Sequence, residues 1–463
     1  MEPANPQCPG CVAAAARIAA LEGQVDEMQR KINSLQEIIE RLSRSAKRQA
    51  APFSRGVPKA NPKPPGRKPG PDYGTHAFRE APQHIDEIHE AKLPEKCPRC
   101  GGSLMQTHTD QQYQVEIPRK PIHRQFNVAV GRCTCCDRQV RGRHPLQTSD
   151  AVGCCRSQVG PEAQAAVVML NKELGLSQGK VCRFFDTFFG IKLSRGGSCQ
   201  IMQRAAATCE WHYADIVTRV RNSPFIVPDE TGWRIGGKLA WLHVAVGQTA
   251  TAYLVARGRG KEASDLLIGP DYAGQLIHDG WSPYDQFDRA AHQTCLGHLS
   301  KRCKELLEIA SSAGAWFPQQ VKGLLKWALE LRDQRDAGAV TRALCAKAGG
   351  GLEVLMRYLL EPTQRDAVNE RLARHLRRHL HQLFTFLHKP GIDATNYKAE
   401  QAIRPAVVNR KVWGGNRTPA GAAAQSILMS VLVTLRQNGQ DALTFISRQL
   451  RSPQLIALPI PAG

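Results

Sequence analysis

Between Ile18 and Leu42 the apolar residues recur at alternating spacings of three and four positions. They are Ile18, Leu21, Val25, Met28, Ile32, Leu35, Ile39 and Leu42, with charged residues and Gln at most positions between them. A hydrophobic repeat of 3.5 residues winds helices around one another, so the pattern predicts a self-association zipper over residues 12–46. An amphipathic helix packed on the rest of the protein fits the same pattern.

Residues 41–71 change character, because they combine nine basic residues with seven prolines and contain no acid. This composition prevents a packed core and predicts a linker over residues 47–80. Such a stretch usually stays solvated, but it can also contact DNA phosphates, and the segment from Pro65 to Gly70 could enter a minor groove. The candidate DNA-binding residues are Arg41, Arg44, Lys47, Arg48, Arg55, Lys59, Lys63, Arg67 and Lys68.

Two C-x-x-C pairs lie within residues 81–150, and alternating stretches at 113–117 and 126–130 stand between them. The pairs are Cys97 with Cys100 and Cys133 with Cys136, which leaves Cys135 as the spare. Tetrahedral Zn²⁺ needs four converging ligands, and two such pairs joined by strands supply four thiolates. The region therefore predicts a zinc ribbon, with free thiols or a redox pair as the alternative.

Residues 151–222 have helical periodicity, in segments at 163–174, 176–189 and 198–220. A glycine-containing break at 190–194 separates the second segment from the third. Two helices joined in this way could form a helix-turn-helix that reads a major groove, although many helical pairs of this kind do not touch DNA. We interpret this region as a helical DNA-binding region.

From Phe225 the period changes to that of strands, at 225–229, 239–246 and 251–255, followed by a helical piece at 261–267 and a strand at 275–279. Three strands, a helix and a fourth strand are the order of a ribonuclease-H-like α/β core. Its first part covers residues 223–294, and an all-helical insertion with glycine breaks near 349–351 covers residues 295–392. The core's last helices cover residues 393–450, and 451–463 form a tail.

Two acids follow the strands that this topology places side by side. Asp229 ends the first strand and Asp279 ends the fourth, while Glu400 and Arg404 lie one turn apart on a later helix. Three converging carboxylates suit two Mg²⁺ or Mn²⁺ ions, which prefer oxygen ligands and promote in-line displacement at phosphorus. Arg404 could contact the phosphate. Taken alone, these acids could equally cap helices or stay solvated.

Composition narrows the choice of partners. The chain has 463 residues, roughly three domains' worth, and 62 Lys and Arg against 41 Asp and Glu, which favours a polyanionic partner such as nucleic acid. No apolar window reaches the roughly 18 residues of a membrane span, and the N-terminus lacks a signal-peptide pattern. Fifteen cysteines are too few for a disulfide scaffold. We expect a cytoplasmic protein with reduced thiols and no membrane contact.

Three blocks of motifs now make the sequence recognisable. They read PDETGWR from Pro228 with WLHV from Trp241, then DGWSPY from Asp279 with HQTCLGH from His292, then NYKAE from Asn396 with RP from Arg404 and NRK from Asn409. In this order they resemble the bacterial transposases of insertion-sequence family sixty-six. The resemblance implies a DDE transposase whose catalytic, Mg²⁺-binding acids are Asp229, Asp279 and Glu400. It departs at Tyr397, where the family often has Asn, and at Gln401, where Arg is common.

The resemblance implies an enzyme that binds the inverted-repeat ends of its element, hydrolyses a phosphodiester and joins the freed 3′-OH to double-stranded target DNA. It also implies small accessory proteins, while the zipper predicts a homo-oligomer. The alternatives are a nuclease on the same fold without strand transfer and a zinc-ribbon DNA-binding regulator with an inactive core.

The remaining candidates receive structural interpretations. Glu230 should point away from Asp229 because neighbouring residues of a strand face opposite sides. His375, His379 and His381 should form a solvated basic face rather than a metal site. Cys295 and His298 should start a packed helix, with a metal role as the alternative. Cys8 with Cys11 could hold half a metal site.

Overall fold

The structure is a computed structural model that describes residues 9–48, 82–115, 117, 120–147, 159–310, 314–389, 391–451 and 457–459. The chain divides into two units, one of residues 55–124 and one of the remainder. Each unit is described by itself. Among the described helices, none is both long and apolar enough to cross a membrane.

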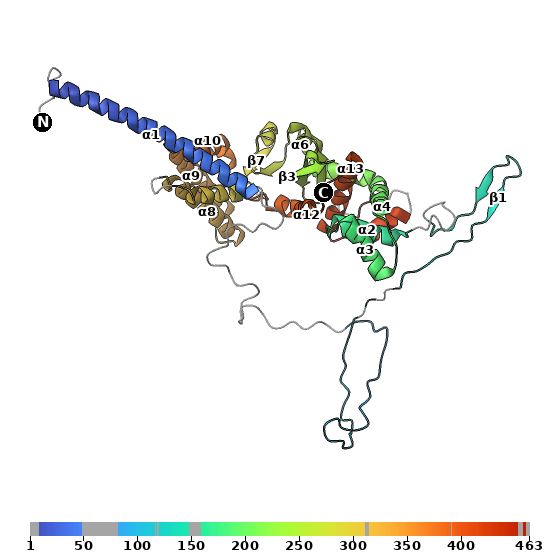
Figure 1. Cartoon of the computed structure of the whole chain (residues 1–463). Helices are drawn as coiled ribbons and strands as arrows, with labels where there is room; N and C mark the ends of the chain where they lie inside the picture. Colours follow the sequence, from blue (N-terminus) through green and yellow to red (C-terminus); the bar gives the residue numbers. More distant parts are fainter. Residues whose placement is uncertain are drawn as a thin grey trace. The chain divides into compact units, whose positions relative to one another are not determined.

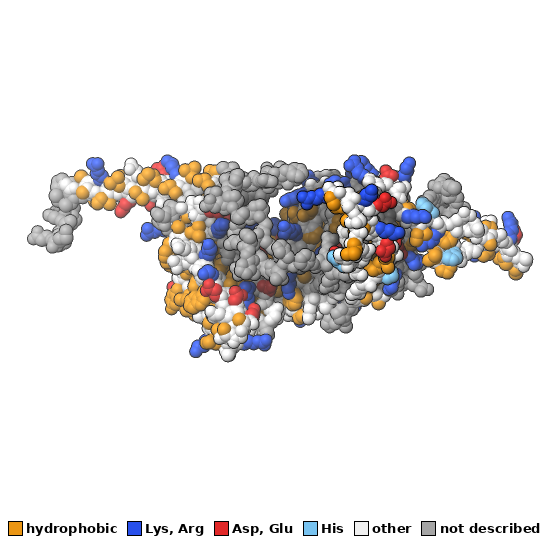
Figure 2. Space-filling model, turned by 90° about the horizontal axis from the view of Figure 1, so that it is seen from below, with side chains coloured by type: hydrophobic (Ala, Val, Ile, Leu, Met, Phe, Trp, Pro, Cys, Tyr) orange, Lys and Arg blue, Asp and Glu red, His pale blue; other side chains and the backbone are white. Residues whose placement is uncertain are grey.

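Helix α1 (Pro9–Arg48) is continuous over 40 residues. Its seam is exposed: Leu35 is 58% exposed and even Ile32 is 47% exposed. Figure 2 shows these hydrophobic side chains repeating along the arm that extends to the left. The predicted helix is confirmed, and its pairing with a second copy stays a prediction.

Helix α1 continues into the basic stretch that follows the predicted zipper. Helix α1 includes Arg41, Arg44, Lys47 and Arg48, because no proline or glycine interrupts the chain between Gly23 and Pro52. The other five basic residues, Arg55, Lys59, Lys63, Arg67 and Lys68, lie outside the described residues, as do Cys8 and the rest of the linker.

The region of the two C-x-x-C pairs has less strand than expected. Its described strands are β1 (Val130–Arg132) and β2 (Gln139–Arg141), which form an antiparallel hairpin. The alternating stretch at 113–117 is not a strand where it is described, and in the stretch at 126–130 only Val130 is. Val115 is 79% exposed and Ile117 is 70% exposed, so alternation there buries no apolar face that would stabilise strand pairing.

Four helices follow: α2 (Pro161–Lys172), α3 (Gln178–Phe189), α4 (Arg195–Thr208) and α5 (Glu210–Arg221). Ser177 and Ser194 cap the starts of α3 and α4, accepting hydrogen bonds from Lys180 N and Gly197 N. Gly190 ends α3 in the left-handed conformation at φ 66°. The single helix predicted at 198–220 is instead two helices, which meet at Cys209.

The central sheet has the order β5-β4-β3-β6-β7. Its strands are β3 (Phe225–Ile235), β4 (Lys238–Val246), β5 (Thr251–Ala256), β6 (Gln275–His278) and β7 (Ala291–Thr294). The pairs β3–β4 and β4–β5 are antiparallel, whereas β3–β6 and β6–β7 are parallel. Helix α6 (Lys261–Ile268) joins β5 to β6. The predicted order of elements is confirmed as an α/β core, and β7 is an additional strand.

Alternation along the strands divides the core between the two faces of the sheet. On one face Val227, Leu242 and Val244 pack with residues of α7, α8 and α12. On the other face Ile226 and Ala245 pack with residues of α2, α4, α5 and α6. Figure 1 shows the two groups of helices flanking the sheet. Asp229 therefore lies on the first face with Val227, and Glu230 lies on the second with Ile226.

The predicted insertion is helical. It comprises α7 (Leu296–Leu307), α8 (Trp316–Asp336), α9 (Arg342–Leu360), α10 (Ala367–His379), the short helix η4 (Leu380–Gln382) and α11 (Thr385–His388). The glycine break expected at 349–351 is wrong, because α9 runs through all three glycines. Gly349 is packed so closely that a Cβ there would lie 3.1 Å from the Leu387 side chain. This packing favours glycine inside the helix despite its low propensity.

The chain returns to the sheet in α12 (Tyr397–Trp413), α13 (Pro419–Gln437) and α14 (Ala442–Arg451). Helix α12 packs against β3 and β4, and α13 packs against β5. Hydroxyl groups of α13 bond to the edge strand, because Ser430 Oγ accepts from Tyr253 N at 2.8 Å and Ser426 Oγ accepts from Val255 N at 2.9 Å. These bonds satisfy backbone donors that an edge strand would otherwise leave open.

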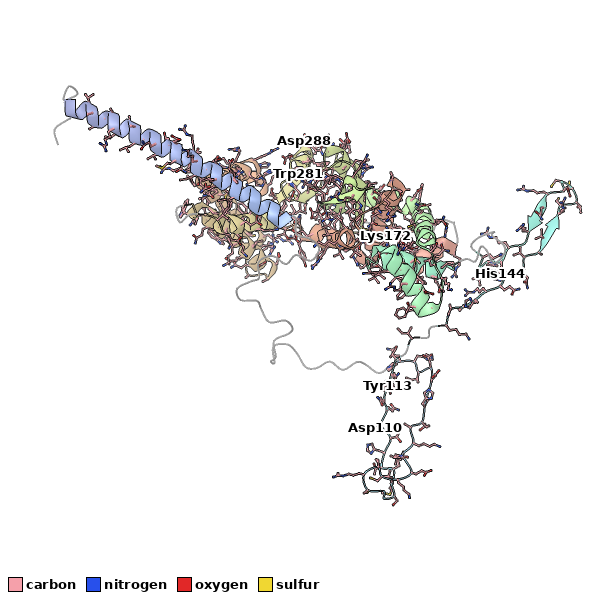
Figure 3. The ribbon with its side chains drawn as sticks, in the orientation of Figure 1. Asp110, Tyr113, His144, Lys172, Trp281 and Asp288 are labelled. Atoms are coloured by element: carbon pink, nitrogen blue, oxygen red, sulfur yellow. The ribbon has the colours of Figure 1, made fainter. Side chains whose placement is uncertain are left out.

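Lys172 carries a buried amine between α2, α12 and α13 (Figure 3). The residue is 4% exposed, and its Nζ donates to Gln425 Oε1 at 2.6 Å and lies 5.5 Å from the centroid of the Trp413 ring. Burial lowers the pKa of Lys172 from 10.5 to about 8. The folded chain therefore holds fewer protons than the unfolded chain between these two values.

This pKa predicts a pH-dependent stability. Since the unfolded lysine binds more protons between pH 8 and 10.5, the free energy of unfolding should rise with pH in that window. Relative to Lys172→Met, which cannot titrate, the wild-type chain should gain about 2 kcal/mol between pH 7.5 and 10. Denaturant unfolding of both proteins measures the difference. If the two proteins give parallel curves of unfolding free energy against pH, burial does not lower the pKa of Lys172.

Candidate active site

The first two acids lie level with each other on neighbouring parallel strands, Asp229 inside β3 and Asp279 just after β6. The register pairs Phe225 with Gln275 and Ile226 with Leu276, and counting on along the chain brings Asp229 level with Asp279. Strand β3 continues beyond Asp229 to Ile235, so this aspartate lies inside a strand and does not end it as expected. Asp279 follows the last residue of β6.

Asp229 is a buried acid with a perturbed pKa. Its burial, together with the nearby charges of Glu230 and Asp279, raises the pKa of Asp229 to about 7. Burying a carboxylate beside other carboxylates costs free energy. Acids with strongly perturbed pKa values are common at functional sites, so Asp229 is a candidate site residue.

Glu400 reaches the same place from α12, where it lies in the first turn. Its side chain is half-exposed, and its Oε1 lies 3.5 Å from His298 Nε2 of α7. The neighbouring Cys295 sulfur and the carboxylates of Asp279 and Glu400 raise the pKa of His298 to about 9. His298 also acts on Asp229, whose pKa it lowers. His298 is therefore in contact with Glu400 and within electrostatic reach of Asp229 and Asp279.

The starts of α7 and α12 are tied together, which explains how Glu400 comes to the sheet. Cys295 N donates to His278 O at 2.7 Å, and Leu296 N donates to Ala394 O at 3.0 Å. Asn396 N donates to Cys295 Sγ at 3.4 Å across 101 positions of sequence. The buried cysteine thus links the end of β6 to the loop before α12.

His298 lies beside Glu400, a position that its sequence motif alone did not predict. The packed helix start expected at Cys295 and His298 is present, since Cys295 is buried and precedes α7. The histidine nevertheless faces the acids and not the core. The signal available in the sequence was the C-x-x-H spacing after the second aspartate.

Arg404 lies one turn after Glu400, as predicted, and is exposed. The residues that depart from the family pattern contact each other, because Gln401 Nε2 donates to the Tyr397 hydroxyl. Within the described part of the chain, no three His, Cys, Asp or Glu side chains stand close enough to hold one metal ion. The acids are therefore near one another without being closed onto a common point.

The solvated basic face predicted for His375, His379 and His381 is wrong for the first two, which lie on α10. His379 is 2% exposed, and His375 is buried enough that its pKa falls to about 4. They pack toward His278 and His292. The rings of these two residues share a hydrogen bond of 2.9 Å between His278 Nε2 and His292 Nδ1. Leucines on the same side of α10 are buried, so this face of the helix packs into the core together with the histidines. His381 alone is exposed as expected.

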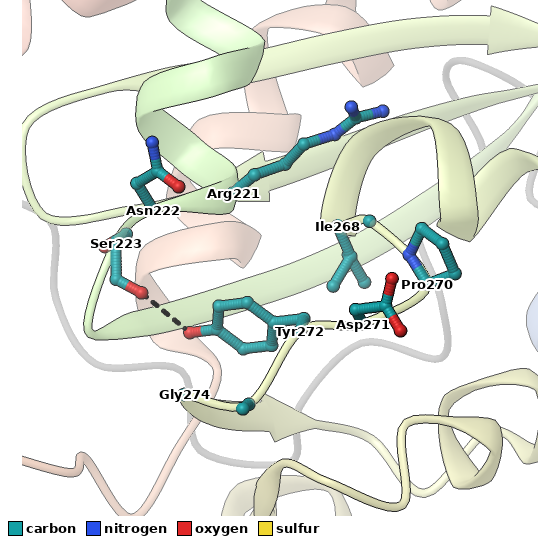
Figure 4. A pocket seen from close by; sticks show the side chains of 10 residues that line it. Arg221, Asn222, Ser223, Ile268, Pro270, Asp271, Tyr272 and Gly274 are labelled. Atoms are coloured by element: carbon teal, nitrogen blue, oxygen red, sulfur yellow. Dashed lines mark hydrogen bonds between the residues drawn. The ribbon is translucent and has the colours of Figure 1, made fainter.

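A pocket of about 490 Å³ lies elsewhere on the core (Figure 4). It is lined by Arg221, Ser223, Tyr272 and neighbouring residues, and the Tyr272 hydroxyl donates to Ser223 O at 3.0 Å. These residues border Phe225 and Gln275, where β3 and β6 begin. The pocket is thus at the opposite end of the parallel strands from the acids, and it does not belong to the candidate active site.

Each C-x-x-C pair forms a knuckle within its own unit. Cys97 N donates to Gly102 O at 2.9 Å, and Cys133 N donates to Arg138 O at 2.9 Å. Backbone N–H groups of Arg99 and Cys100 lower the pKa of the Cys97 thiol, and those of Cys136 and Cys135 lower the pKa of Cys133. The first cysteine of each knuckle therefore favours the thiolate, the form that binds metal.

A family model described as Transposase IS66 family matches residues 156–424, which is more than half of the chain. The chain therefore belongs to this transposase family. The matched range contains the sheet, the helical insertion and all three acids. No curated protein matches the chain.

Proposed function

We propose that the protein is a DDE transposase that cuts the ends of its element and joins them to target DNA. The observations that carry the proposal are that Asp229 and Asp279 lie level on neighbouring strands and that Glu400 contacts His298, which also interacts electrostatically with both aspartates. Family membership supports a transposase role in general. The order and directions of the strands support a ribonuclease-H-like core, in which the central strand and its parallel neighbour carry two of the acids.

The donor set fits hard divalent cations. Carboxylate oxygens are the ligands that Mg²⁺ and Mn²⁺ prefer. A bound cation would offset the electrostatic cost of keeping Asp229 charged and buried beside other acids. Asp229, Asp279 and Glu400 would hold the metal. Bound Mg²⁺ activates an attacking oxygen and stabilises a leaving oxygen at phosphorus.

The chain's own residues then have distinct tasks. The aspartates stay fixed on the sheet, while Glu400 enters from a helix. His298, with its raised pKa, carries a positive charge that balances the carboxylates and orients Glu400. Arg404 is exposed one turn away and contacts the phosphate. Hydrolysis and strand transfer both exchange one P–O bond for another, so the same residues serve both steps without a covalent protein–DNA intermediate.

DNA binding is proposed for the helical region formed by α2, α3 and α4. The exposed face of α4 presents Arg195, Cys199, Gln200, Gln203 and Arg204 and no acid. A second helix that packs on the first and exposes Arg and Gln can read base edges in a major groove. The basic residues between Arg41 and Lys68 would add phosphate contacts that do not depend on sequence.

One assay separates the candidate functions. Purified protein is incubated with Mg²⁺, a duplex carrying the element's end and a target plasmid. A transposase should free a 3′-OH at the end and yield joined products, whereas a nuclease should cut without joining. Binding without metal-dependent cutting would favour a regulator with an inactive core and overturn the proposal.

The four-cysteine zinc site is proposed separately, and it predicts a metal content. The full-length chain should contain about one Zn²⁺, and Cys97→Ser with Cys100→Ser should remove it, because two thiolates cannot hold a structural zinc. Elemental analysis of the purified protein measures this. Cys135→Ser is the matched control, which should keep the metal. Full zinc retention in the double variant would refute the ribbon.

A further inference from the structure

Arg259 lies in the loop between β5 and α6 and is bound to a buried carboxylate. Its Nε and Nη2 both donate to Glu230 Oε1, at 2.9 and 2.6 Å. The other oxygen, Oε2, accepts from the Tyr284 hydroxyl at 2.7 Å. The Glu230 side chain is 3% exposed, so the arginine holds it in one place on the face of the sheet opposite to the acids.

The same guanidinium lies between two aromatic rings. Its central carbon is 3.9 Å from the centroid of the Trp281 ring and 4.7 Å from that of Trp241. Cation–π contacts of this kind restrict both the arginine and the rings. Arg259 therefore connects the loop after β5 with β4, with β3 and with the segment that follows β6.

The two residues that Arg259 holds are those that orient the aspartates. Glu230 N donates to Asp229 Oδ1 at 2.9 Å, and Trp281 N donates to Asp279 Oδ1 at 2.9 Å. Each aspartate thus receives one hydrogen bond from the backbone of a residue whose side chain touches Arg259.

The loop that carries Arg259 is itself fixed. His243 is 4% exposed on β4, opposite Glu230 in the strand register, and its Nε2 bonds to Gly258 O at 3.1 Å. Burial lowers the pKa of His243. Arg257, two positions earlier than Arg259, is exposed.

We propose that Arg259 is a positioning residue of the active site. By holding Glu230 and Trp281 at once, it fixes the separation and orientation of Asp229 and Asp279 on the other side of the backbone. Two carboxylates that repel each other need such a restraint to stay ready for a divalent cation. The inference rests on the proposed function of the acids and assigns Arg259 no contact with substrate.

The test measures cation binding directly as well as cutting. Electron paramagnetic resonance of Mn²⁺ with the full-length chain gives an apparent Kd, and cleavage rates over a range of Mg²⁺ give the half-saturating concentration. Arg259→Gln should raise both about tenfold, the effect typical of losing a group that orients a metal ligand. The matched control Arg257→Gln removes the same charge from the same loop and should change neither.

Two further variants distinguish positioning from general instability. Arg259→Lys keeps the charge but loses the two-pronged bond and the stacking, so it should give an intermediate shift. Glu230→Gln should shift Mn²⁺ affinity like Arg259→Gln, and the double variant should be no worse than either single variant, because both remove one interaction. If Arg259→Gln does not fold, judged by its thermal transition, Arg259→Lys and Glu230→Gln carry the test.

The outcomes separate this inference from the proposed function. Wild-type Mn²⁺ affinity and Mg²⁺ dependence in a folded Arg259→Gln or Arg259→Lys chain would overturn positioning and leave the transposase proposal intact. A wild-type chain that binds Mn²⁺ through Asp229 but cuts no DNA would contradict the function, while a shift in Mn²⁺ affinity on changing Arg259 would still support positioning. A wild-type chain without Mn²⁺ binding overturns both.

Discussion

Asp229→Asn, Asp279→Asn and Glu400→Gln should each lower the rate of end cleavage by about 10³-fold or more while leaving end binding nearly unchanged. Each change removes one negative oxygen donor but keeps the shape of the side chain. The acids lie inside β3, just after β6 and in the first turn of α12, whereas the proposed DNA-reading face lies on α4. Cleavage of labelled ends and a gel-shift assay in EDTA measure the two properties separately.

Asp288→Asn is the control for this series. Asp288 is an exposed carboxylate a few residues after Asp279, and its loss changes the net charge by the same amount. This variant should cut at the wild-type rate. If one of the three active-site variants still cuts as fast as Asp288→Asn, its residue is not one of the catalytic acids.

Placing Asp at both Val25 and Ile32 should dissociate the N-terminal helices and impair the pairing of two DNA ends, while a single end is still bound. Both residues occupy the first apolar position of their heptads, where the β-branched Ile18 and Ile39 also stand, and Leu dominates the other position. This distribution favours a two-stranded coiled coil. A charge buried there costs about 3–5 kcal/mol when it has no partner.

Sedimentation of the full-length chain measures the association, and a two-end pairing assay measures its consequence. Asp at Ala20 and Ser34, which are exposed outside the seam, adds the same charge to the same helix and should leave the dimer intact. A wild-type chain that is monomeric at micromolar concentration would mean that the exposed seam has another use.

The elements of the core could be predicted because each has a clear period and a local signal. Ser177, Gly190 and Ser194 mark helix ends that the structure confirms. Where the length of an element depends on residues far away in the sequence, it could not be predicted. Helix α9 runs through Gly349–Gly351 because the segment around Leu387 packs on it, and no local pattern reports that neighbour. Strand β7 has only four residues, too few to show alternation.

The acids of the candidate site could be found from motif and topology, but the groups around them could not. His298 was visible as a spacing, yet its direction depends on the tie between Cys295 and the loop before α12. The histidines of α10 read as a basic face because arginines surround them, and only packing against His278 shows that they are internal. Arg259 lies in a loop without periodicity.

The bond between Cys295 and Asn396 has a consequence for the order of folding. The two partners are 101 positions apart, so bringing Glu400 to the sheet closes a long loop, whose entropic cost is recovered only when the intervening helices pack. Phe317, Leu352 and Leu372 of those helices share one core with Val227 and Leu242 of the sheet. A nascent chain therefore holds two of its acids before the third can arrive. On the proposed function, the active site is therefore complete only after the helical insertion and the start of α12 have joined the sheet.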